Sequence, residues 1–95
     1  MDGLWQNDVQ GLGGSEWKIE AGGKATESGL GAASGTASLA GQTLTIEWKT
    51  ANGYEGNYTV TLDASCNKGS GQTEQTVAPP GITPKTYPVT FTHLN

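Results

Sequence analysis

The most regular pattern in the chain is an alternation of apolar and polar residues on both sides of a turn, within residues 43–63. Two runs, Thr43–Lys49 and Asn57–Asp63, flank a segment that contains Gly and Asn. Alternation with a period of two on both sides of a turn predicts a half-buried β-hairpin. Its apolar face would carry Leu44, Ile46, Trp48, Tyr58, Val60 and Leu62.

Shorter alternating runs on either side of this hairpin predict a chain of seven or eight β-strands. We expect the other strands at Gly3–Asp8, Glu16–Glu20, Lys24–Ser28, Gly35–Ala40, Gln72–Val77 and Tyr87–His93. The Gly-containing segments Val9–Ser15 and Ala64–Gly71 are expected to be loops. No segment has the periodicity of a helix.

The C-terminal run is expected to close the sheet. Tyr87, Val89 and Phe91 would present three sizeable side chains on one face. Pro88 has no backbone donor, which places this strand at a sheet edge or leaves that position unpaired. Because a Pro-rich connector precedes the run, packing and ladder bonds must hold it, and we predict that it pairs with Gly3–Asp8.

Strands that follow one another through mostly short connections favour a single all-β domain, residues 1–95, folded as an antiparallel up-and-down β-barrel. A β-sandwich is the alternative. We favour the barrel because its closure removes exposed strand edges, which a Thr-rich sheet would otherwise have to protect.

Charge and composition narrow the range of partners. The net charge is −4 and all five cationic residues are Lys, which argues against binding to nucleic acid or to an anionic membrane. No apolar run approaches the length of a membrane span. Residues 1–3 lead almost directly into the first strand without a secretory signal, so we expect the mature form of a secreted or extracellular domain with an added Met.

Residue types that carry catalysis or bind metals are sparse. The chain has one His and one Cys, so it cannot build a His-rich or Cys-rich metal cluster. His93 is expected to pack at a strand end, and Cys66 to be either a small semi-apolar residue or an accessible thiol. Most carboxylates fall on predicted solvent faces and lack the burial that tunes a catalytic pKa. We therefore expect no enzyme activity, no bound metal and no cofactor.

Aromatic residues remain as candidate binding groups. Inward positions hold Trp17, Trp48, Tyr58, Tyr87 and Phe91. These residues are predicted mainly to form the core, although inward aromatic residues at the open end of a small barrel also line a ligand mouth.

Two further aromatic residues, Trp5 and Tyr54, lie at a strand start and in a turn. We predict that their rings are exposed and can stack on a sugar or another flat ligand. Tyr54, at the tip of the central turn, is the better of the two for that role.

Two stretches resemble the avidin-like β-barrels. Gly3-Leu4-Trp5-Gln6-Asn7, followed by Gly14-Ser15-Glu16-Trp17, is similar to the family's opening, in which a Gly-x-Trp-x-Asn strand leads to a Gly-Ser that begins the second strand. Leu44–Lys49 with Gly56-Asn57-Tyr58 is similar to the family's middle hairpin. The lipocalin-like barrels share the opening Gly-x-Trp. The resemblance implies a barrel in which Asn7 and Ser15 hydrogen-bond the ureido group of a biotin-type ligand and Trp48 stacks on it.

The resemblance extends over about half of the chain. Lys24–Ser34 contains no Tyr where the family has a pocket Tyr, and Leu62 stands where it has another pocket Trp. The last strand offers no acidic residue for the ureido group. The resemblance therefore supports the barrel more than it supports biotin as the ligand.

These features together predict a non-catalytic binding module for a small molecule or a sugar in an aromatic-lined barrel mouth. The predicted contacts are Trp48, Tyr54, Asn7 and Ser15, with Trp5 as a further stacking platform. Two alternatives stay open: a structural subunit that forms homo-oligomers by adding strands at its sheet edges, and a binder of biotin-type ligands.

Overall fold

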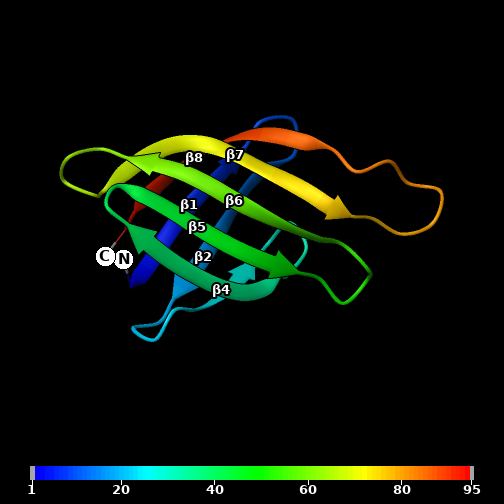
Figure 1. The fold of residues 1–95 in the computed structure, drawn as a ribbon, viewed down its shortest axis with the longest axis horizontal. Helices are drawn as coiled ribbons and strands as arrows, with labels where there is room; N and C mark the ends of the chain where they lie inside the picture. The colour runs from blue at the N-terminus through cyan, green and yellow to red at the C-terminus, as the bar shows by residue number, and fades with distance from the viewer. Residues whose placement is uncertain (1, 95) are drawn as a thin grey trace.

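The structure, a computed structural model, describes residues 2–94 and is a closed barrel of eight antiparallel β-strands (Figure 1). The strands are β1 Gly3–Val9, β2 Gly13–Ile19, β3 Lys24–Ser28, β4 Ser34–Ala40, β5 Thr43–Lys49, β6 Glu55–Leu62, β7 Lys68–Val77 and β8 Thr86–His93. They pair in chain order, and β8 returns to pair with β1. The predicted up-and-down barrel is confirmed, and the sandwich alternative is wrong. No helix that is long and apolar enough to cross a membrane occurs in residues 2–94.

The central hairpin folds as its alternation predicts. β5 and β6 pair from Thr43↔Thr61 to Lys49↔Glu55. Of the inward side chains of this pair, Leu44, Ile46 and Val60 have no exposed surface. Because successive side chains of a strand point to opposite faces, the Thr residues between them remain on the outer face.

Two of the predicted loops are shorter than expected, because the strands beside them are longer. In the segment predicted as the loop Val9–Ser15, β1 and β2 remain paired up to Val9↔Gly13. In the segment predicted as the loop Ala64–Gly71, β7 already begins at Lys68. The glycines of this segment occupy inner-face positions of β7, where the backbone of β6 comes so close that an added Cβ at Gly71 would overlap the carbonyl oxygen of Thr59. Gly in this segment therefore marks a close approach between strands rather than a turn.

β8 closes the barrel as predicted. It pairs with β1 from Trp5↔His93 to Val9↔Val89 and with β7 on its other side. Since β8 has a neighbour on both sides, the idea that Pro88 marks a sheet edge is wrong. The Pro88 carbonyl accepts a hydrogen bond of 2.9 Å from the backbone N–H of Gln10. Pro88 cannot donate the reciprocal bond, and the β1–β8 register ends at Val9↔Val89, so the predicted alternative of an unpaired position holds on the β1 side.

At the end of the barrel where β1 begins and β8 ends (Figure 1), buried side chains fill the interior. Trp5 has no exposed surface there; its ring stacks on the His93 ring at a centroid distance of 4.5 Å and lies 6.2 Å from the Phe91 ring. The prediction of Trp5 as an exposed stacking platform is therefore wrong, because the inward parity of its position buries the ring. His93 packs at the strand end as predicted.

Candidate functional site

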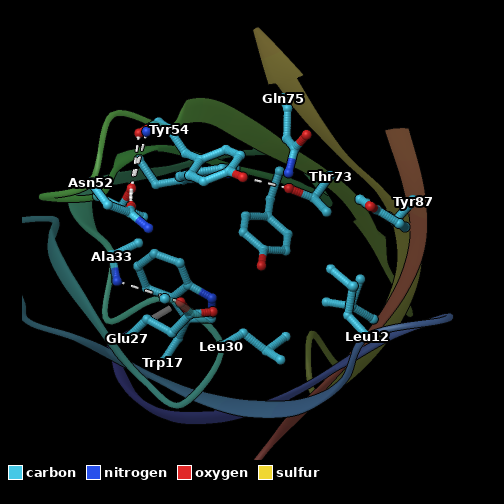
Figure 2. A pocket seen from close by; sticks show the side chains of 15 residues that line it. Leu12, Trp17, Glu27, Leu30, Ala33, Asn52, Tyr54, Thr73, Gln75 and Tyr87 are labelled. Carbon is cyan, nitrogen blue, oxygen red and sulfur yellow. Dashed lines mark hydrogen bonds between the residues drawn. The ribbon is translucent and has the colours of Figure 1, made fainter. Parts of the chain in front are cut away.

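The opposite end of the barrel holds a pocket of about 290 Å³ (Figure 2). The ends of β3, β5 and β7, the start of β8 and the turns beside them form its wall. Figure 2 shows Trp17, Glu27 and Leu30 on one side of an open space, with Tyr54 and Thr73 facing them from the other side. This volume lies near the lower end of the range for small-ligand sites, about 300–1,000 Å³.

The wall of the pocket is largely aromatic. Trp17, Trp48, Tyr54, Tyr58 and Tyr87 all line it. The rings of Trp17 and Tyr58 meet edge to face at 5.6 Å, and the Trp48 ring lies 6.4 Å from Tyr58 on its other side. These three rings come from β2, β5 and β6, so the closure of the barrel packs them into one cluster, in which Trp17 and Tyr58 are buried and Trp48 is half-buried.

The rim of the pocket carries two exposed leucines. Leu12, in the β1–β2 turn, is 49% exposed, and Leu30, in the β3–β4 loop, is 41% exposed. Each stands in a segment that otherwise consists of small or polar residues. Both leucines line the pocket, so they extend its apolar surface to the mouth.

A chain of polar groups lies at the floor of the pocket. Ser15 Oγ donates to Glu27 Oε2 at 2.8 Å, and Asn7 Nδ2 donates to Ser15 Oγ at 3.0 Å and to the Tyr58 hydroxyl at 2.9 Å. An ionised carboxylate only accepts hydrogen bonds, so Glu27 determines the donor and acceptor roles of the whole chain. The Ser15 hydroxyl donates its proton to a hydrogen bond with Glu27, so Asn7 must donate to both Ser15 and Tyr58. The Tyr58 oxygen therefore accepts from Asn7.

Burial, followed by the negative charge of Glu27, raises the pKa of Tyr58 from 10.0 to about 12. Nearby donors on Trp17, Asn7 and Thr73 oppose this shift. The indole N–H of Trp17 favours the ionised phenol electrostatically, but it does not reach hydrogen-bond geometry with any described residue. Tyr58 is therefore a neutral hydroxyl group throughout the neutral pH range.

We expect the free energy of unfolding to decrease as the pH rises from 10 to about 12. In this interval the unfolded chain releases the Tyr58 proton while the folded protein keeps it, so rising pH favours the unfolded state. This stabilisation is complete below pH 10, and the difference between pKa values of 10.0 and about 12 corresponds to a loss of about 3 kcal/mol. Urea unfolding of the wild type and of Tyr58→Phe, compared across this interval, measures the contribution. Equal pH dependence in the two proteins would contradict it.

Trp48 is held in place by its neighbours. Its indole Nε1 donates to Thr73 Oγ1 at 3.2 Å, and the Thr73 hydroxyl donates to the Asn57 carbonyl at 3.0 Å. Beneath the ring lies Gly56, where an added Cβ would be only 2.6 Å from Cζ2 of Trp48. The ring is thus oriented before any ligand arrives, which lowers the entropic cost of binding.

Tyr54 is the last residue of the β5–β6 turn, directly before β6. Its backbone N–H donates to Thr50 Oγ1 at 3.1 Å, and its carbonyl accepts from the Thr50 N–H at 2.8 Å. The Thr50 hydroxyl also contacts Oδ1 of Asn52. These bonds hold the turn, and they leave the half-buried Tyr54 ring facing the pocket.

The structure separates the predicted contact residues into three groups. Trp48 and Tyr54 line the pocket. Asn7 and Ser15 are only 0% and 6% exposed and do not line it, because they support Glu27 and Tyr58 from behind. Trp5 lies at the filled end of the barrel.

Sequence reasoning missed Glu27 as a site residue and assigned Tyr58 mainly to the core. The signal for Glu27 was its inward parity two residues after Ala25, in a strand whose pattern is weak. The signal for the rim was a single large apolar residue, Leu12 or Leu30, within each Gly-containing segment.

No family model, curated protein or solved structure matches this chain. The resemblance to avidin-like barrels stays a prediction that rests on the opening strands and the central hairpin. The pocket is therefore interpreted from its own residues.

Proposed function

We propose that this protein is a non-catalytic binding module that takes a small molecule or a sugar in the open mouth of the barrel. The observation that carries the proposal is the pocket of about 290 Å³, whose lining combines the half-buried rings of Trp48, Tyr54 and Tyr87 with the carboxylate of Glu27. Apolar walls with a few convergent polar groups are the usual composition of small-ligand sites.

The polar groups of the pocket suit binding better than catalysis. Among the described residues that line it, Glu27 is the one carboxylate, and there is no His, Cys, Lys or Arg. Hydrolysis of a glycoside generally uses two carboxyl groups, and nucleophilic catalysis needs a nucleophile beside a base. The Ser15 hydroxyl, the closest approach to such a pair, is buried behind the lining and donates to Glu27.

The proposal predicts that a ligand changes the Trp fluorescence of the protein, because Trp17 and Trp48 line the pocket. We expect a saturable change with at least one member of a panel of small molecules and glycans that includes biotin. Trp48→Phe should weaken binding by about three- to tenfold, since a contact between aromatic rings contributes about 0.5–1.5 kcal/mol. Thr59→Ala, on the exposed outer face of β6, is the matched control and should leave the affinity unchanged.

A panel that produces no change in fluorescence with any class of ligand would contradict the proposal.

The two alternatives are tested alongside it. Addition of strands between copies lacks a free sheet edge in residues 2–94, where every strand pairs on both sides, and light scattering after size exclusion measures the assembly state. Biotin-type binding would need Asn7 and Ser15 to become accessible from the pocket.

A further inference from the structure

The charge of the pocket points to a class of ligand. Among the described lining residues, Glu27 is the only one whose side chain is charged at neutral pH. Its carboxylate accepts hydrogen bonds from Ser15 Oγ at 2.8 Å and from the Ala33 N–H at 3.4 Å. Both donors are neutral, and no cation of residues 2–94 forms an ion pair with Glu27. The pocket therefore has a net negative charge without a counter-ion from the protein.

The aromatic wall favours the same sign of ligand charge. The face of an aromatic ring carries partial negative charge, so a cation within about 6 Å of a ring centroid is attracted to it. Trp48, Tyr54 and Tyr87 line the pocket with half-buried rings, and the buried rings of Trp17 and Tyr58 pack behind Trp48.

An anionic or fully apolar ligand fits this arrangement less well. An anion would be repelled by the carboxylate of Glu27 and by the overall charge of −4. An apolar ligand would displace water from the Glu27 carboxylate without forming a hydrogen bond to it, which carries a large desolvation cost. A cation avoids both penalties, because it pairs with Glu27 while it contacts the rings.

We propose that the pocket binds a small organic cation of the alkylammonium or quaternary ammonium class, with Glu27 as its counter-ion and the half-buried rings of Trp48, Tyr54 and Tyr87 as its aromatic contacts. The inference rests on the proposed binding function and adds the chemical class of its ligand. It uses residues of β3, β5, β8 and the β5–β6 turn.

The deciding experiment compares two compounds of the same shape on the wild-type protein. One is choline; the other is its neutral carbon isostere, in which a tert-butyl group replaces the trimethylammonium group. Trp fluorescence titrations are made at neutral pH, with NaCl holding the ionic strength constant. We expect choline to bind at least about tenfold more tightly than the isostere, as expected for a desolvated cation against aromatic rings.

Two charge-removing variants then locate the effect. Glu27→Gln should weaken choline binding at least about tenfold while it changes the affinity for the neutral isostere by less than about twofold. Glu74→Gln removes the same charge from an exposed outer position of β7 and should change neither affinity by more than about twofold. Circular dichroism and melting temperature report whether each variant is folded. If Glu27→Gln does not fold, the comparison of the two compounds on the wild type still decides.

Equal binding of choline and the isostere, or tighter binding of the isostere, would overturn the inference. So would a panel in which neutral ligands or sugars bind and choline does not, although the proposed binding function would then stand. If no compound binds, both proposals fail. Equal loss of choline affinity in the Glu27→Gln and Glu74→Gln variants would assign the preference to overall charge and would also overturn the role of Glu27.

Discussion

A chain that ends at Lys85, and so lacks β8, is expected not to fold as a monomer. β8 pairs with both β7 and β1, so its removal opens the barrel and leaves two unpaired strand edges. It also removes Val89 and Phe91 from the core, where they are 3% and 0% exposed. Burial of each such side chain contributes about 1.5–3 kcal/mol, while the net stability of a typical domain is about 5–15 kcal/mol.

Circular dichroism and light scattering of the truncated protein test this expectation. An unfolded chain, or a dimer in which each copy accepts a strand of the other, agrees with it. A folded monomer with the melting temperature of the full chain would contradict the structural role of β8.

Point variants of β8 separate packing from loss of the strand. Phe91→Ala should cost about 3–5 kcal/mol, because its ring lies 5.3 Å from the Tyr58 ring and 6.2 Å from the Trp5 ring. Thr90→Ala, at the exposed position beside it, is the matched control and should change stability by less than about 0.5 kcal/mol.

Gly35→Ala is expected to destabilise the barrel by at least about 3 kcal/mol, at the upper end of the range for overpacking. An added Cβ at Gly35 would overlap the carbonyl oxygen of Glu47. It would also lie 2.7 Å from the carbonyl carbon of Glu47 and 2.9 Å from Cα of Trp48. All three atoms belong to the backbone of β5, so no side chain can rotate away to make room. The strands β4 and β5 would have to separate where they pair as Gly35↔Trp48.

The matched control for this variant is Gly22→Ala in the β2–β3 turn. An added Cβ there meets no atom within 4 Å. Its stability should stay within about 0.5 kcal/mol of the wild type or increase slightly, because Ala restricts the unfolded chain. Urea unfolding of both variants measures the difference. Similar stabilities for Gly35→Ala and Gly22→Ala would contradict the close contact between β4 and β5.

The alternation of residue types alone determined which segments are strands and which side chains point inward. Lys24–Ser28 and Thr43–Lys49 have the predicted bounds, and Gly3–Asp8 pairs with the C-terminal strand as predicted. These features could be predicted because the period of two is a local property of an extended backbone. The extent of β7 could not be predicted. Its inner face carries Gly69 and Gly71, whose role depends on the neighbouring strand and has no local signature.

For the candidate site, the alternation predicted that Trp48 and Tyr58 face the interior, whereas Trp5 was predicted to be exposed and Asn7 was assigned to the site only by the resemblance. Only the tertiary structure decided their depth. Trp5 is buried at the filled end, Asn7 lies behind the floor, and Trp48 and Tyr58 line the pocket. Parity distinguishes the two faces of a strand, but position along the barrel axis depends on how all eight strands are staggered around the closed sheet.

The chain of polar groups at the floor of the pocket was also only partly predictable from the sequence. Asn7 and Ser15 are direct partners across β1 and β2, so a hairpin prediction brings them together. Glu27 and Tyr58 come from β3 and β6, and they reach the same group only because the sheet curves into a closed barrel. The sequence by itself therefore determined the strands, their inward residues and the supply of aromatic rings. The closure of the barrel decided which of them surround one negatively charged pocket, because contacts across the interior depend on its diameter and strand stagger rather than on any local pattern.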